Sequence, residues 1–234
     1  MTQQHITSAF DRDLEDIQAK IMKMGGLVEA AILEGAISLE TRDEERAEKV
    51  RAADKAIDLL EEKINEDAAR LIALRSPTAG DLRLVLAIMK ISGNLERIGD
   101  YAKNMAKRTG VLAQMAPVND SAGSLRRMAK EVSKMLKDAL DAYIHRDAEL
   151  AGDVIKRDSD VDQMYNGLFR EFLTFMMEDP RNITACMHLH FIGKNIERMG
   201  DHVTAIAEQV VYLVTGEYPE EDRVKSDVTS TQTI

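Results

Sequence analysis

A seven-residue string that occurs twice constrains this chain more than any other feature. Residues 94–100 read NLERIGD and residues 195–201 read NIERMGD, an offset of 101 residues in a chain of 234. Five of the seven positions are identical, and the other two are apolar in both copies. A repeat of this spacing predicts two similar halves, each of an ordinary domain size.

Each half is predicted to contain three helices. Trp is absent and aromatic residues make up only 4% of the chain, a composition that favours helices over strands. Proline interrupts both halves at matching places, since Pro77 precedes the third predicted helix and Pro180 precedes the sixth. We expect Thr7 or Ser8 to cap the first helix. The six helices are expected at about 9–39, 43–74, 81–109, 125–145, 148–177 and 183–214.

The expected fold class is therefore all-α, with two tandem similar three-helix bundles, six long helices and a pseudo-twofold internal repeat. Residues 115–123 are rich in turn formers and separate the halves. We place the first domain at 1–116 and the second at 117–216. The polar tail, 217–234, is expected to be disordered.

The third and sixth predicted helices each carry an unbroken apolar stripe. The spacing alternates between four and three residues, which is typical of packing in a helical bundle. We expect these residues to form the core. They are Leu84, Ile88, Ile91, Leu95, Ile98, Ala102 and Met105 in the third helix, and Ala185, Leu189, Ile192, Ile196, Met199, Val203 and Ile206 in the sixth.

Charge and cysteine content narrow the function. The net charge of −10 argues against general binding of nucleic acid. The single cysteine, Cys186, cannot form an internal disulfide, which indicates a reducing compartment. The first residues lack the regions of a signal peptide, and no stretch is long and apolar enough for a transmembrane helix. We therefore expect a cytoplasmic protein.

The repeated string places two carboxylates one helical turn apart at the edge of each stripe. These are Glu96 and Asp100 in the first copy, and Glu197 and Asp201 in the second. Two like charges at this spacing repel each other by a few tenths of a kcal/mol unless a cation lies between them. A repeated arrangement that is unfavourable in isolation suggests two equivalent cation sites.

The preceding helix of each half carries further acids. Asp58 and Glu62 are one turn apart in the first half, and Asp158 and Asp162 are one turn apart in the second. Asn166 takes the place expected for a second acid after Asp162. Packing of each pair against its neighbouring helix would gather oxygen ligands suited to Mg, Mn or Ca, or to bridged iron. No Glu-x-x-His motif is present, so a ferritin-like di-iron oxidase is not expected.

Other interpretations of these acids remain open. Acidic residues one turn apart usually form a solvated helix face. A metal-free scaffold could use the acidic stripe to bind a basic partner. A carboxylate-bridged metalloenzyme would need a His or Lys beside the cluster as acid or base, and none is apparent near Glu96 or Glu197.

Three motifs in order resemble the PhoU family. They are the duplicated Glu-Arg-x-Gly-Asp, residues 76–83 (SPTAGDLR) and residues 176–181 (MMEDPR), and the resemblance runs from about residue 5 to about residue 215. It implies two three-helix bundles in a cytoplasmic protein that often forms a homodimer and is not an enzyme. It also implies negative regulation of phosphate uptake and of phosphate-starvation signalling. The implied partners are a phosphate ABC importer, including its ATPase subunit, and a sensor histidine kinase.

The resemblance also implies metal binding at the family motif Glu/Asp-x-x-x-Asp. Members of the family hold multinuclear iron or zinc, or resemble binders of Mg or Mn, so the identity of the metal stays open. In this sequence the motif, matched fully or in part, falls on Asp58, Glu62, Glu96, Asp100, Asp158, Asp162, Glu197 and Asp201. The first-half pair Asp58 and Glu62 departs from the motif by ending in Glu.

Overall fold

Six long α-helices make up the part of the chain that the computed structural model describes, residues 2–219. They are α1 (Thr2–Thr41), α2 (Glu44–Arg75), α3 (Ala79–Ala113), α4 (Ser121–His145), α5 (Ala148–Glu178) and α6 (Ile183–Thr215), with one 3-10 turn, η1 (Pro180–Asn182), before α6. The all-α prediction is confirmed. The predicted cap at Thr7 or Ser8 is wrong, because α1 already begins at Thr2. Most of the tail predicted to be disordered, from residue 220 on, lies outside the described residues.

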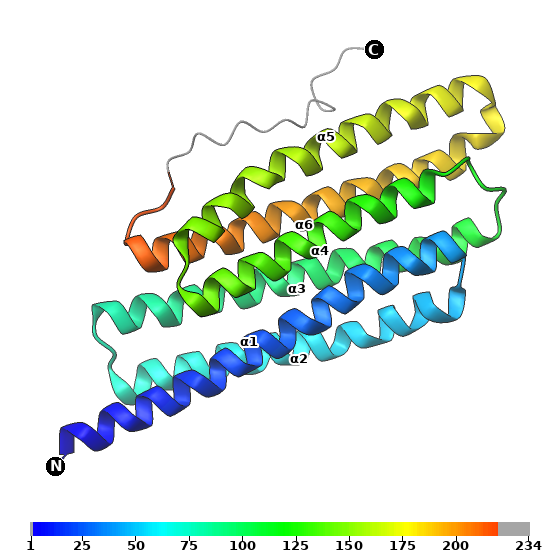
Figure 1. Cartoon of the computed structure of the whole chain (residues 1–234). Coiled ribbons are helices and arrows are strands. Elements are labelled where there is room, and N and C mark those ends of the chain that lie inside the picture. Colours follow the sequence, from blue (N-terminus) through cyan, green and yellow to red (C-terminus); the bar gives the residue numbers. More distant parts are fainter. Residues whose placement is uncertain (1, 220–234) are drawn as a thin grey trace.

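The helices form two three-helix bundles packed side by side. α1, α2 and α3 pack on one another, as do α4, α5 and α6. The bundles meet where α3 packs on α6 and α1 packs on α4. α2 and α5 contact only their own bundles and lie at opposite edges of the molecule (Figure 1). None of the helices between residues 2 and 219 combines the length and apolarity that crossing a membrane requires.

Both predicted stripes lie in the core, which also takes buried apolar residues from the other four helices. Every residue of both stripes is buried, and the most exposed of them, Leu84, keeps only 9% of its surface. Burial of apolar side chains at about 25 cal/mol per Å² is the main favourable term in helix packing. Because α3 and α6 pack both within their bundles and on each other, their stripes place the repeated strings at the centre of the molecule.

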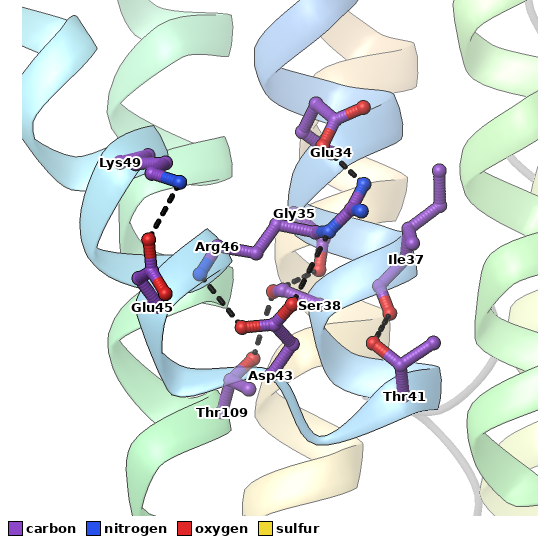
Figure 2. A network of polar contacts seen from close by, with 10 residues as sticks. All are labelled: Glu34, Gly35, Ile37, Ser38, Thr41, Asp43, Glu45, Arg46, Lys49 and Thr109. Carbon is purple, nitrogen blue, oxygen red and sulfur yellow. Dashed lines mark hydrogen bonds and ion pairs between the residues drawn. The ribbon is translucent and has the colours of Figure 1, made fainter.

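The turn between the first two helices of each bundle is also repeated. Arg42 and Arg146 adopt a left-handed backbone, with φ of 55° and 56°, and Asp43 and Asp147 then cap α2 and α5. In the first turn, Asp43 accepts a hydrogen bond of 2.9 Å from the backbone N–H of Arg46 (Figure 2). The Arg46 side chain in turn reaches Glu34 on α1 at 2.5 Å.

These turns fix a second offset between the halves. Asp43 and Asp147 are 104 residues apart, whereas the repeated strings are 101 residues apart. The second half is therefore three residues shorter between the start of its middle helix and its motif string. Positions on α2 therefore correspond to positions on α5 with an offset of 104 residues. Positions on α3 correspond to positions on α6 with an offset of 101 residues.

We predict that Asp147→Ala destabilises the chain by about 1 kcal/mol, the usual cost of losing a helix cap. Asp147 accepts hydrogen bonds from the backbone N–H groups of Glu149 and Leu150, at 3.0 and 2.9 Å. Asp147→Asn should keep most of the stability, since Asn caps equally well. Urea denaturation measures both changes. Asp153→Ala, which removes only an exposed ion pair on α5, is the control, and an equal loss in this control would contradict the capping role.

Candidate functional site

The repeated strings face each other across the contact between α3 and α6. Asn94 Oδ1 lies 2.8 Å from His202 Nδ1, and the rings of Tyr101 and His202 are 5.7 Å apart. Arg198 lies over the Tyr101 ring, 6.0 Å from its centre. Residue numbers rise along α3 as they fall along α6, so the two helices run antiparallel. The two strings therefore meet near the pseudo-twofold axis.

On the side of α3 that faces α2, four carboxylates gather. Glu96 and Asp100 of α3 and Asp54 and Asp58 of α2 form what we call the first cluster. Lys103 connects the two helices within it, because its ammonium contacts Asp54 and lies 3.0 Å from Asp100 Oδ1. Arg97 approaches the outer side of the cluster, 3.5 Å from Glu96 and 3.7 Å from Asp100.

The first cluster is crowded with negative charge. Burial raises the pKa of Glu96, and the neighbouring charge of Asp100 raises it further. Partial desolvation raises the pKa of Asp58, although its side chain is exposed, and the charge of Asp54 raises that pKa further. The pKa of Lys103 moves up too, because Asp54 and Asp100 accept its hydrogen bonds. Keeping these carboxylates ionised and close together therefore costs free energy. A cation placed among them is stabilised.

Asp54 is the most buried member of the first cluster. It keeps 5% of its surface, and no hydrogen-bond partner for its Oδ1 atom exists among the described residues. Gly99 permits this close approach. A Cβ atom on Gly99 would lie 3.1 Å from Ile57 and 3.7 Å from Asp54 Oδ1.

The equivalent carboxylates of the second half form the second cluster, which is more buried. It comprises Asp158 and Asp162 of α5 and Glu197 and Asp201 of α6, and the first three keep only 5% of their surface. Each of the four takes part in at least one polar contact. Among the contacts made by this cluster, Asp158 accepts a hydrogen bond of 3.2 Å from the Thr204 hydroxyl, and Lys194 donates one of 2.9 Å to Glu197.

Glycine contacts identify which positions correspond in the two halves. A Cβ atom on Gly200 would lie 3.4 Å from Val161 and 3.6 Å from Asp158 Oδ1, which repeats the surroundings of Gly99. Asp54 therefore corresponds to Asp158, and Asp58 to Asp162. The acidic pair on α2 is Asp54 and Asp58. The acidic pair on α5, Asp158 and Asp162, has the same i to i+4 spacing.

Sequence reasoning missed Asp54 and chose Glu62 in its place. Glu62 is exposed on α2, one turn beyond Asp58 and away from Asp54, and it corresponds to Asn166 on α5. The repeated caps Asp43 and Asp147 are 104 residues apart. Applying this offset to Asp158 would have identified Asp54 from the sequence. The same reasoning overlooked lysines beside the acids, since Lys103 and Lys194 both contact cluster carboxylates.

The donor set of each cluster suits a hard divalent cation. Carboxylate oxygens from two helices are the ligands that Mg²⁺ and Mn²⁺ prefer, and the unpartnered Asp54 Oδ1 offers one such atom. With the side chains as they stand, no three His, Cys, Asp or Glu groups within residues 2–219 converge on one position suited to a metal. Binding an ion therefore requires changes of side-chain rotamer within the clusters.

We predict that Glu96→Gln stabilises the metal-free protein at pH 7 by about 0.5 kcal/mol, because it removes a crowded, partly screened charge. The raised pKa means that folded Glu96 retains its proton to higher pH than the unfolded chain does. At a pH above the pKa of folded Glu96, the ionised side chain therefore weakens the fold. The stability advantage of the variant should shrink as the pH falls through the range between the folded and unfolded pKa values of Glu96. Urea denaturation in EDTA from pH 4 to 7 measures this.

Glu48→Gln on α2 is the control, since Glu48 is exposed and pairs with Arg51. It should give no such gain at pH 7. If Glu96→Gln were less stable than the parent at pH 7, the account of charge crowding would be contradicted.

Comparison with known proteins places the chain among its relatives. The family described as PhoU domain matches residues 21–109 and 125–210, one match per bundle. A phosphate-specific transport system accessory protein PhoU homolog from Rhizobium meliloti is 44% identical over 231 residues, covering 99% of this chain and 98% of the relative. The homolog of the same name from Zymomonas mobilis is 47% identical over 94% of this chain and 93% of its own.

Solved structures agree with this placement. The crystal structure of PhoU from Pseudomonas aeruginosa has a TM-score of 0.85 and 39% identity, covering 89% of this chain and 100% of that one. A phosphate transport system regulatory protein PhoU from Streptococcus pneumoniae has a TM-score of 0.81 and 31% identity, covering 90% and 99%. On its repeated strings, its two three-helix bundles and these matches, the chain belongs to the PhoU family.

Proposed function

We propose that this protein is a negative regulator of phosphate uptake and of phosphate-starvation signalling, and that it is not an enzyme. The observation that carries the proposal is similarity over almost the whole chain, 99%, to a relative named as an accessory protein of a phosphate-specific transport system. The match to both bundles, with the repeated strings intact, supports the same role for this chain.

The proposed regulator works as an adaptor in the cytoplasm, as a homodimer. Its partners are the ATPase subunit of a phosphate ABC importer and a sensor histidine kinase. The name of the Rhizobium meliloti relative supports the importer side of this proposal. An elongated all-helical body with two similar bundles offers separate surfaces to two partners (Figure 1).

The proposal includes divalent metal at the carboxylate clusters. The residues that would hold it are Asp54, Asp58, Glu96 and Asp100 in the first cluster, and Asp158, Asp162, Glu197 and Asp201 in the second. A bound cation would neutralise charge and tie α2 to α3, and α5 to α6. The all-oxygen donor set favours Mg²⁺ or Mn²⁺, with iron next and zinc last, since zinc sites usually add Cys or His.

A metal-free adaptor is the second candidate, and one observation favours it. Each cluster already contains a lysine, since Lys103 contacts Asp100 at 3.0 Å and Lys194 contacts Glu197 at 2.9 Å. These ammonium groups offset part of the carboxylate charge without a metal. A role for Lys103 as a catalytic base is disfavoured, because its raised pKa keeps it protonated at neutral pH.

Deletion of the gene should derepress phosphate uptake. Uptake of radiolabelled phosphate by cells grown in phosphate-rich medium should rise in the deletion strain and return to the parental level on complementation with the intact gene. Complementation with the chain carrying Asp153→Asn, an exposed change, should also restore repression. Normal uptake in the deletion strain would contradict the regulatory role.

Purified protein dialysed against Mn²⁺ should retain the metal after buffer exchange. Asp100→Asn combined with Asp201→Asn removes one carboxylate from each cluster without changing side-chain size, so bound Mn²⁺ measured by elemental analysis should fall sharply. The matched control is Glu45→Gln with Asp153→Asn, which alters two exposed ion pairs and should leave the metal content unchanged. Parent protein without Mn²⁺ would favour the metal-free adaptor.

A further inference from the structure

One position makes the two clusters chemically different. Lys103 on α3 and Thr204 on α6 are 101 residues apart and therefore equivalent in the repeat. Both donate to the equivalent buried aspartate, because the Lys103 ammonium contacts Asp54 and the Thr204 hydroxyl contacts Asp158 at 3.2 Å. The first half thus carries a full positive charge where the second half carries a neutral hydroxyl.

The Lys103 ammonium lies where a bridging cation would lie. It contacts Asp54 of α2 and, at 3.0 Å, Asp100 of α3, so it joins carboxylates from the two helices. Asp54 is buried and brings a second oxygen, Oδ1, with no hydrogen-bond partner among the described residues. A buried carboxylate costs free energy unless it is paired or hydrogen-bonded, and Lys103 supplies a counter-charge to Asp54.

The lysine of the second half occupies a different position. Lys194 corresponds to Gly93 in the first half, so it has no counterpart there. It forms an ion pair with Glu197, three residues further along the same helix, at 2.9 Å. The arginines differ too, since Arg97 approaches Glu96 and Asp100, whereas Arg198 lies over the ring of Tyr101. Lys103 and Arg97 thus bring two positive charges to the carboxylates of the first cluster.

We propose that Lys103 takes the place of a divalent cation in the first cluster, so that Mn²⁺ enters this cluster only when Lys103 is removed. The inference rests on the metal-binding part of the proposed function and restricts the metal of the parent protein to the second cluster. The two halves share a fold and a motif, but the first is held together by an internal ammonium group. Thr204 leaves the second cluster without a charge at this position.

The test compares Lys103→Thr, which gives the first half the residue of the second, with the parent protein. Isothermal titration with Mn²⁺ counts the ions bound per chain. Lys103→Thr should bind one more ion than the parent. Lys103→Arg keeps the charge and should match the parent. The matched control is Lys107→Thr, an exposed lysine one turn further along α3, and it should also match the parent.

Thermal melting provides an independent readout. In EDTA, Lys103→Thr should melt below both the parent and Lys107→Thr, because buried Asp54 loses its counter-charge. Adding Mn²⁺ should raise its melting temperature by more than it raises that of Lys107→Thr. If Mn²⁺ did not raise the melting temperature of Lys103→Thr by more than that of Lys107→Thr, the inference would be overturned.

The outcomes separate this inference from the wider proposal. A parent that binds no Mn²⁺, with Lys103→Thr binding one ion, would remove metal from the proposed function and still support Lys103 as the resident cation. Equal binding by the parent and Lys103→Thr would overturn the inference whatever the parent binds. Thr204→Lys should lose any ion bound at the second cluster. Because Thr204 is fully buried, circular dichroism must first show that this variant folds; if it does not, the Lys103 variants decide alone.

Discussion

The antiparallel packing of α3 on α6 is the contact on which the rest of the structure depends. Each of these helices buries an apolar stripe and also packs against the other, so both bundles share one central contact. The contact between Asn94 and His202 sets the repeated strings opposite each other. Glu96 and Glu197 each follow a stripe residue by one position. With the strings fixed, Glu96 therefore lies toward α2 and Glu197 lies toward α5.

Packing and electrostatics oppose each other at those outward positions. Gly99 and Gly200 let the neighbouring helix approach, and a Cβ atom at either site would lie within 3.7 Å of a buried aspartate oxygen. The close approach brings carboxylates together and raises the pKa of Glu96 and Asp58 through burial and mutual repulsion. Each cluster contains a lysine that offsets part of that repulsion, but the two lysines come from non-equivalent positions.

Much of this could be predicted from sequence because helical periodicity is a local property. The two stripes, the proline breaks and the repeated strings follow from spacings within one helix, and all the predicted stripe residues are buried. The sequence prediction named Glu62 and not Asp54 because choosing between them required the register between two helices. That register depends on the stretch between the start of α2 and the motif string of α3, which is three residues longer than its counterpart in the second half. The role of Lys103 could not be predicted from the motif, since its contact with Asp54 spans 49 residues.

The central claim is that two clusters with the same fold differ in how their charge is balanced. Anomalous diffraction from crystals grown with Mn²⁺ tests it most directly. The account predicts an anomalous peak among Asp158, Asp162, Glu197 and Asp201, and no peak between Asp54 and Asp100, where the Lys103 ammonium should be seen. A peak between Asp54 and Asp100 in the parent protein would contradict it.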